Sequence, residues 1–117
     1  MSIPEGALFN VDVLLKEHGK FIDGYNQFLK VPSLRAGIYE LMAGADDKQT
    51  PHKEDEIYFV LSGRGRLSVK GTTGIQEFEA RSGSILFVKA GLEHHFHAIT
   101  EDLRLLVFFS SARTIES

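Results

Sequence analysis

Short apolar runs separated by turn residues are the feature of this sequence that most limits its fold. After Gly19, Gly, Pro, Asp and Ser divide the chain into runs of four to nine residues rich in β-branched and aromatic side chains, a pattern typical of strands in a sandwich or barrel. We expect eight strands, at Gln27 to Val31, Leu34 to Met42, Glu56 to Ser62, Gly65 to Lys70, Ile75 to Ala80, Ser84 to Lys89, His94 to Thr100 and Asp102 to Ser110. Glycines at residues 62–65 and 71–74 predict tight hairpins. The sequence therefore predicts an all-β, antiparallel protein.

One short helix is expected before the strands. Asn10 can cap a helix over Val11 to His18, because its side chain can accept a free backbone N–H, and Gly19 can take the left-handed conformation after the last turn. A chain of 117 residues suits a single domain. We place the N-terminal arm and helix in residues 1–26 and a barrel in residues 27–111.

Two of the predicted strands are apolar on both alternating faces, at residues 57–61 and 105–109. A sheet with one face in water would alternate apolar and polar residues instead. One face can fill the interior, and the other must be covered by the N-terminal segment or by a second copy. Because two-fold dimers are the commonest assembly, we favour a homodimer.

Composition excludes several classes of function. The formal net charge is -3, without a basic block, which argues against nucleic acid as a partner. The absence of cysteine leaves imidazole, carboxylate and amide oxygen as the metal ligands on offer. No leader pattern opens the chain, and no apolar run approaches the roughly 18 residues of a membrane span, so we expect a cytoplasmic protein without a membrane partner.

Histidine and glutamate side chains begin two of the predicted strands. His52 and Glu56 lie four residues apart, so an extended backbone between them would direct both side chains to one side. His94 opens a later strand after a turn, and alternation then directs His95 and His97 outward. Imidazole and carboxylate together suit a first-row divalent metal. The remaining carboxylates before Glu56, at positions 46, 47, 54 and 55, are most simply loop or strand-edge residues.

The spacing of these residues resembles that of the cupin superfamily. Glu56 and Gly63 keep the E-x6-G spacing of its first motif, and Gly83, Gly91 and His94 keep the G-x7-G-x2-H spacing of its second. The resemblance spans about half of the chain, from residue 44 to residue 98. It implies an antiparallel double-stranded β-helix, or jelly-roll barrel.

The resemblance also implies a metal site at His52, Glu56 and His94 that holds one divalent ion of iron, manganese, nickel or zinc. The family's first motif has two histidines, whereas this chain has one. Depending on the register, the missing histidine falls on Thr50 or on Gln49, and we favour Gln49 as a weak fourth ligand because its amide oxygen reaches farther. Lys89 and Ala98 replace the usual Pro and Asn of the second motif without removing a ligand.

Aromatic residues on the predicted strands suggest a pocket beside this site. Tyr58, Phe87, Phe96 and Phe108 would line the barrel and make it apolar around a few polar groups. Glu56 and Tyr58 are the candidate catalytic residues, the tyrosine through a proton transfer or a hydrogen bond to substrate. Members of the superfamily include dioxygenases, isomerases and lyases, so we expect a metal-dependent enzyme acting on a small organic substrate. The alternative is a non-enzymatic cupin that binds a small molecule or sugar.

Overall fold

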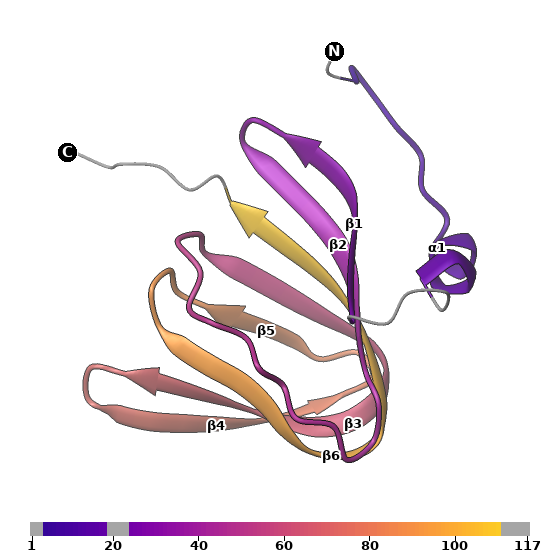
Figure 1. The fold of residues 1–117 in the computed structure, drawn as a ribbon. Helices are drawn as coiled ribbons and strands as arrows, with labels where there is room; N and C mark the ends of the chain where they lie inside the picture. The colour runs from indigo at the N-terminus through magenta and orange to yellow at the C-terminus, as the bar shows by residue number, and fades with distance from the viewer. Residues whose placement is uncertain (1–3, 19–23, 111–117) are drawn as a thin grey trace, which may run out of the picture.

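The protein is one curled antiparallel sheet preceded by a short helix (Figure 1). The computed structural model describes residues 4–18 and 24–110. Its elements are α1 (Val11–His18), β1 (Tyr25–Val31), β2 (Leu34–Leu41), β3 (Glu56–Gly71), β4 (Gly74–Arg81), β5 (Ile85–Val88) and β6 (Glu93–Ser110). The predicted all-β jelly roll with a short N-terminal helix is confirmed.

The helix begins where the sequence predicts. The side-chain oxygen of Asn10 accepts the backbone N–H of Val13 at 3.1 Å, which is the expected N-terminal cap. The bounds of α1 match the predicted range, Val11 to His18. The predicted C-terminal role of Gly19 lies outside the described residues. Within residues 4–18 and 24–110, no helix is long and apolar enough to cross a membrane.

Within the described residues, six strands replace the eight predicted ones, because two predicted breaks lie inside long strands. The hairpin expected at residues 62–65 is wrong: β3 continues through Gly63, whose φ of 96° belongs to a register shift against β6. A Cβ on Gly63 would lie 2.0 Å from the Asp102 carbonyl oxygen, so only glycine fits where the strands cross. β6 likewise runs on through residue 101, with Ala98 at a φ of 50°. The hairpin at Gly71–Gly74 is confirmed.

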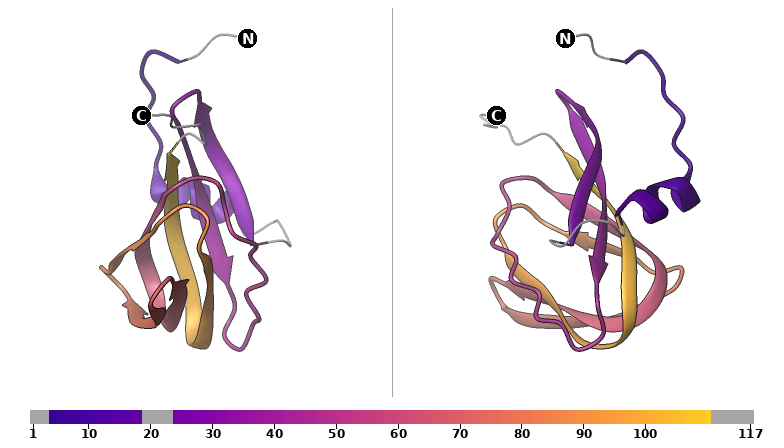
Figure 2. Two further views of the ribbon diagram at one scale, coloured as in Figure 1. Left: turned by 90° about the vertical axis from the view of Figure 1, so that its left-hand side faces the viewer. Right: turned by 45° about the vertical axis from the view of Figure 1, so that its right-hand side comes forward.

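The pairing order is β1-β2-β6-β3-β4, and β5 adds to the first half of β3. Both long strands bend, so the sheet curls around its inner face (Figures 1 and 2). That face holds the main hydrophobic cluster, which includes Tyr58, Val60, Leu67, Phe96, Leu103, Leu105 and Phe109. Glu56 begins β3 between Val88 of β5 and Phe109 of β6, so its carboxylate is placed beside this cluster.

The described residues cover the outer face on one side only. Helix α1 contacts β1 and β2, and Leu14 of α1 is buried together with Ala36 and Ile38 of β2. Across β3 and β5, by contrast, Ile85 is 70% and Phe87 is 59% exposed. The N-terminal segment therefore covers β1 and β2 and leaves the apolar outer surface of β3 and β5 open to solvent.

Candidate metal centre and adjoining cavity

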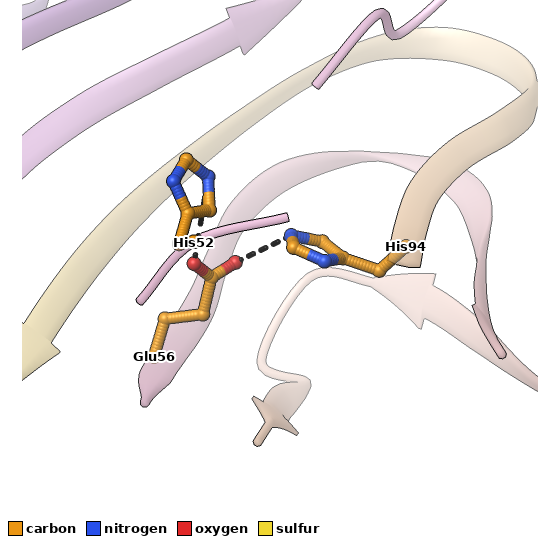
Figure 3. Close-up of side chains that lie close together, drawn as sticks. All are labelled: His52, Glu56 and His94. Atoms are coloured by element: carbon orange, nitrogen blue, oxygen red, sulfur yellow. Dashed lines mark ion pairs between the residues drawn. The ribbon is translucent and has the colours of Figure 1, made fainter. Parts of the chain in front are cut away.

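Three side chains from three parts of the chain meet at the inner face (Figure 3). His52 comes from the loop between β2 and β3, Glu56 from the first position of β3, and His94 from the second position of β6. One ligand atom from each lies within 4.8 Å of the others. His94 Nε2 is 2.8 Å from Glu56 Oε1, and His52 Nε2 is 3.7 Å from Glu56 Oε2. The predicted residues therefore converge on one point.

Backbone contacts explain how the loop carrying His52 reaches the start of β6. The N–H of Gly91 donates to the His52 carbonyl oxygen at 2.7 Å, and Gly91 has a φ of 84° that favours glycine. Asp55 strengthens the same junction, because its carboxylate accepts the Ala90 N–H at 2.8 Å. Its carbonyl oxygen accepts the Ser110 N–H at 3.0 Å and so also holds the loop against the far end of β6. The turn before β6 thus fixes the loop that carries one histidine beside the strand that carries the other.

The donor atoms fit a cation. Glu56 and His94 are buried, and Glu56 Oε2 and His94 Nε2 have no hydrogen-bond partner among the described residues. The Leu92 carbonyl oxygen lies 2.9 Å from His94 Nδ1, so Nδ1 carries the proton of the neutral ring and Nε2 directs a lone pair at the carboxylate. Such an arrangement needs a proton or a metal ion between the two groups.

The neighbouring Glu56 carboxylate affects the pKa of His94. Burial lowers the pKa of the ring, but the hydrogen bond that a protonated Nε2 would donate to Glu56, the Leu92 carbonyl oxygen and the negative charge of the Glu56 carboxylate together outweigh burial and hold this pKa above its ordinary value. The side chain of His52 is 27% exposed. His52 therefore lies on the solvent side of the centre, and Glu56 and His94 form its buried side.

Gln49 lies against the same centre. Its Oε1 is 3.2 Å from His52 Nε2 and accepts the Tyr58 hydroxyl at 3.0 Å. That hydroxyl also contacts Glu56 Oε1. Thr50, the other residue that the motif alignment left open, is exposed and contributes to a different cavity from the one described next.

A cavity of about 640 Å³ opens beside His52. Its polar lining comes from Tyr25, Arg35, Tyr39, Glu40, Asp46, Lys48, Gln49, His52 and Tyr58, and its apolar lining includes Leu41, Met42, Val107 and Phe109. This volume is in the range of small-molecule sites, and so is the combination of apolar walls with a few polar groups. The candidate metal ligand His52 is thus part of the wall of a cavity that fits a small organic compound.

The pocket residues expected from the sequence divide between the two faces. Tyr58 lines the cavity, and Phe96 packs behind it in the core with ring centroids 5.0 Å apart. Phe87 and Phe108 lie on the outer face, which corrects their assignment to the pocket. Phe109 lines the cavity in place of Phe108, because it is the next residue along β6 and side chains alternate.

Arg35 lines the cavity and is paired with Glu54, a contact that sequence reasoning missed. Arg35 Nε and Nη2 donate to the two oxygens of Glu54 at 2.7 and 3.2 Å, and the guanidinium stacks 3.8 Å from the centroid of the Phe109 ring. The hydrogen bonds from Arg35 lower the pKa of Glu54. No local motif marks this pair, since its members are 19 residues apart.

Comparison with known proteins identifies the family. The sequence pattern of the cupin domain matches residues 37–109, and the chain belongs to this family. An uncharacterized protein of Streptomyces coelicolor is 43% identical over 102 residues, which are 87% of this chain and 93% of that protein.

Solved structures show the same fold at low sequence identity. KdgF from Halomonas sp. matches with a TM-score of 0.64 and 20% identity, over 76% of this chain and 78% of that chain. Oxalate decarboxylase of Bacillus subtilis, described with Mn(II) centres, matches with a TM-score of 0.66 and 19% identity, over 78% of this chain and 28% of that chain.

Proposed function

We propose that the protein is a metal-dependent enzyme that acts on a small organic substrate. His52, Glu56 and His94 would hold one divalent first-row ion, with the Gln49 amide oxygen as a fourth ligand. The observation that carries this proposal is a pair of buried ligand atoms without a hydrogen-bond partner among the described residues, Glu56 Oε2 and His94 Nε2, beside a histidine that lines a cavity of about 640 Å³.

The ligand set favours catalysis over a purely structural ion. Two histidines, one carboxylate and one amide oxygen leave two positions of a six-coordinate ion open for substrate, as is typical of catalytic sites, whereas structural zinc sites are tetrahedral and closed by four protein ligands. A bound ion of this kind supplies Lewis-acid or redox chemistry. Iron, manganese, nickel and zinc all fit the donor types, and the similar fold of an oxalate decarboxylase with Mn(II) centres is compatible with that range.

Tyr58 is the proposed acid or hydrogen-bond donor next to the ion. Burial and the neighbouring Glu56 carboxylate raise the pKa of the Tyr58 hydroxyl well above its usual value, so the group keeps its proton at neutral pH. The hydroxyl contacts Glu56 and Gln49 and also lines the cavity. It can therefore hold a proton beside both the ligands and a bound substrate.

Elemental analysis of the purified protein tests the metal site. We expect about one first-row metal ion per chain in the wild type, and its loss in His52→Ala and in His94→Ala. His97→Ala is the matched control, because His97 is a surface histidine whose Nε2 lies 2.7 Å from Glu77. Full metal content in both ligand variants, or none in the wild type, would contradict the proposal.

A comparison of metal-loaded and chelated protein tests the enzymatic role. Wild type loaded with each candidate metal and His94→Ala are incubated with a small-metabolite extract that is followed by mass spectrometry. An enzyme depletes a compound only when metal is bound. A compound that binds equally well after chelation, with nothing depleted, would identify the protein as a non-enzymatic binding module.

We also propose that a second copy of the chain covers the open outer surface of β3 and β5. Ile57, Phe59, Ile85 and Phe87 are neighbours in the strand pairing, and none carries a charge. An uncharged apolar surface does not repel its own copy, as an isologous two-fold interface requires. Leu106 and Phe108 of β6 continue this surface toward the part covered by α1.

Light scattering coupled to gel filtration tests the dimer. We expect about twice the chain mass of 13.1 kDa for the wild type and the single-chain mass for Phe87→Glu. Ile75→Glu is the control, since Ile75 is exposed on β4 outside this surface and its replacement should leave the dimer intact. A monomeric wild type would contradict the proposal.

A further inference from the structure

The carboxylate of Asp47, in the loop between β2 and β3, binds the amide nitrogen of Gln49, which is the side of the amide that does not face the candidate metal centre. Gln49 Nε2 donates to Asp47 Oδ2 at 2.7 Å, while Gln49 Oε1 faces Tyr58 and His52. Asp47 is itself fixed by two other donors, the Phe96 backbone N–H at 2.8 Å and the Tyr39 hydroxyl at 2.6 Å. The carboxylate thus connects the loop to β6 and β2 and uses one oxygen to bind the glutamine amide.

These contacts permit only one orientation of the Gln49 amide. An ionised carboxylate accepts hydrogen bonds and donates none. Rotating the amide by half a turn would direct Gln49 Oε1 at Asp47 Oδ2, so two acceptors would face each other in a partly buried site. It would also direct the two N–H groups toward the metal site. Asp47 therefore determines that an oxygen, which can bind a metal ion, faces His52 and Glu56.

We infer that Asp47 is a positioning residue that holds the Gln49 amide oxygen in place as the fourth metal ligand. The inference rests on the proposed metal site. It gives a role to a carboxylate that the sequence indicated only as a loop residue, and it explains why Gln49 rather than Thr50 completes the ligand set. Partners that orient a metal ligand typically contribute about 10- to 100-fold to metal affinity.

A double-mutant cycle on Co(II) affinity separates positioning from a general loss of structure. Apoproteins of the wild type, Asp47→Ala, Gln49→Leu and the double variant are titrated with Co(II), whose absorption spectrum reports its ligands. We expect Asp47→Ala to weaken binding roughly 10- to 100-fold, and to have no further effect once Gln49→Leu has removed the oxygen. An equal loss in both backgrounds would overturn the inference, because Asp47 would then act without Gln49.

Asp47→Asn is the conservative variant. Its oxygen can accept from Gln49 and from the Phe96 N–H, while its amide donates to the Tyr39 hydroxyl oxygen. We expect Co(II) affinity within a few-fold of the wild type. Thermal unfolding of each variant verifies that it is folded at the titration temperature.

A metal-free measurement distinguishes failure of this inference from failure of the proposed function. In the NMR spectrum of the wild-type apoprotein, one N–H of the Gln49 side chain should be shifted and protected from solvent exchange, and Asp47→Ala should remove both effects. A freely exchanging amide in the wild type would overturn the orientation itself. A wild type that binds no Co(II), with the amide protected, would instead overturn the metal site and the ligand role of Gln49.

Discussion

In residues 57–61 of β3 and 105–109 of β6, the inner and outer faces are built from similar apolar residues in different surroundings. On the inner face, Tyr58, Val60, Leu105 and Val107 are buried in the main cluster beside the candidate metal centre. On the outer face, the alternate residues of the same segments are partly or largely exposed, and helix α1 contacts mainly β1 and β2. The comparison shows that an apolar composition on both faces does not by itself say which face encloses the site.

The largest expected difference between the two faces is in folding stability. Leu105 is fully buried, so Leu105→Ala should lower the free energy of unfolding by about 2–5 kcal/mol through lost burial and a cavity. Leu106→Ala removes the same atoms from the outer face and should cost about 1 kcal/mol or less at dilutions that favour the monomer. Denaturant unfolding of both variants measures the difference. Equal losses would show that the outer face is as well packed as the inner one.

The partly buried salt bridge between Arg35 and Glu54 should contribute more than a salt bridge on the surface. Because Arg35 lowers the pKa of Glu54, the ionised pair stabilises the fold above the ordinary glutamate pKa, and this contribution is lost as the pH falls through the lowered value. We expect Glu54→Gln to cost roughly 1–2 kcal/mol at pH 7 and progressively less below about pH 4.

Unfolding curves across this pH range test that prediction. Glu79→Gln is the control, because its partner Arg64 is exposed and the pair, at 3.1 Å, is screened by water. A difference between wild type and Glu54→Gln that stays constant from pH 7 to pH 3 would contradict a contribution that depends on the ionised carboxylate.

The smallest predicted effect concerns the bend in β6 that separates its two halves. Ala98 is exposed and has a φ of 50°, a conformation that is unfavourable for a residue with a Cβ. Ala98→Gly should therefore raise the free energy of unfolding by about 0.5–1 kcal/mol. Ala43→Gly, at an exposed position without a positive φ, should bring no gain. A loss of stability in Ala98→Gly would show that the conformation is not strained.

Much of the fold was predictable because its signals are local. The cap at Asn10, the glycines of the β3–β4 hairpin and the apolar runs locate the helix and the strands. Gly63 was misinterpreted because a glycine with positive φ serves both a turn and a bulge, and only the facing Asp102 backbone distinguishes them. Ala98, likewise, carries no sequence signal for a bend.

The candidate site was predictable where spacing defines it. His52, Glu56 and His94 follow from the resemblance to cupin motifs, and they converge in the structure. The residues of the cavity wall were harder to predict, because a strand sequence that is apolar on both faces does not show whether Phe108 or Phe109 points inward. Contacts between distant residues, such as Arg35 with Glu54 and Asp47 with Phe96, depend on the folded sheet.

Anomalous X-ray diffraction tests the central claim most directly. Crystals are grown with each candidate metal, and data are collected at the absorption edge of that metal. We expect one strong peak per chain, about 2 Å from His52 Nε2, His94 Nε2 and a Glu56 carboxylate oxygen. A peak elsewhere on the chain, or none for any of the four metals, would contradict the account.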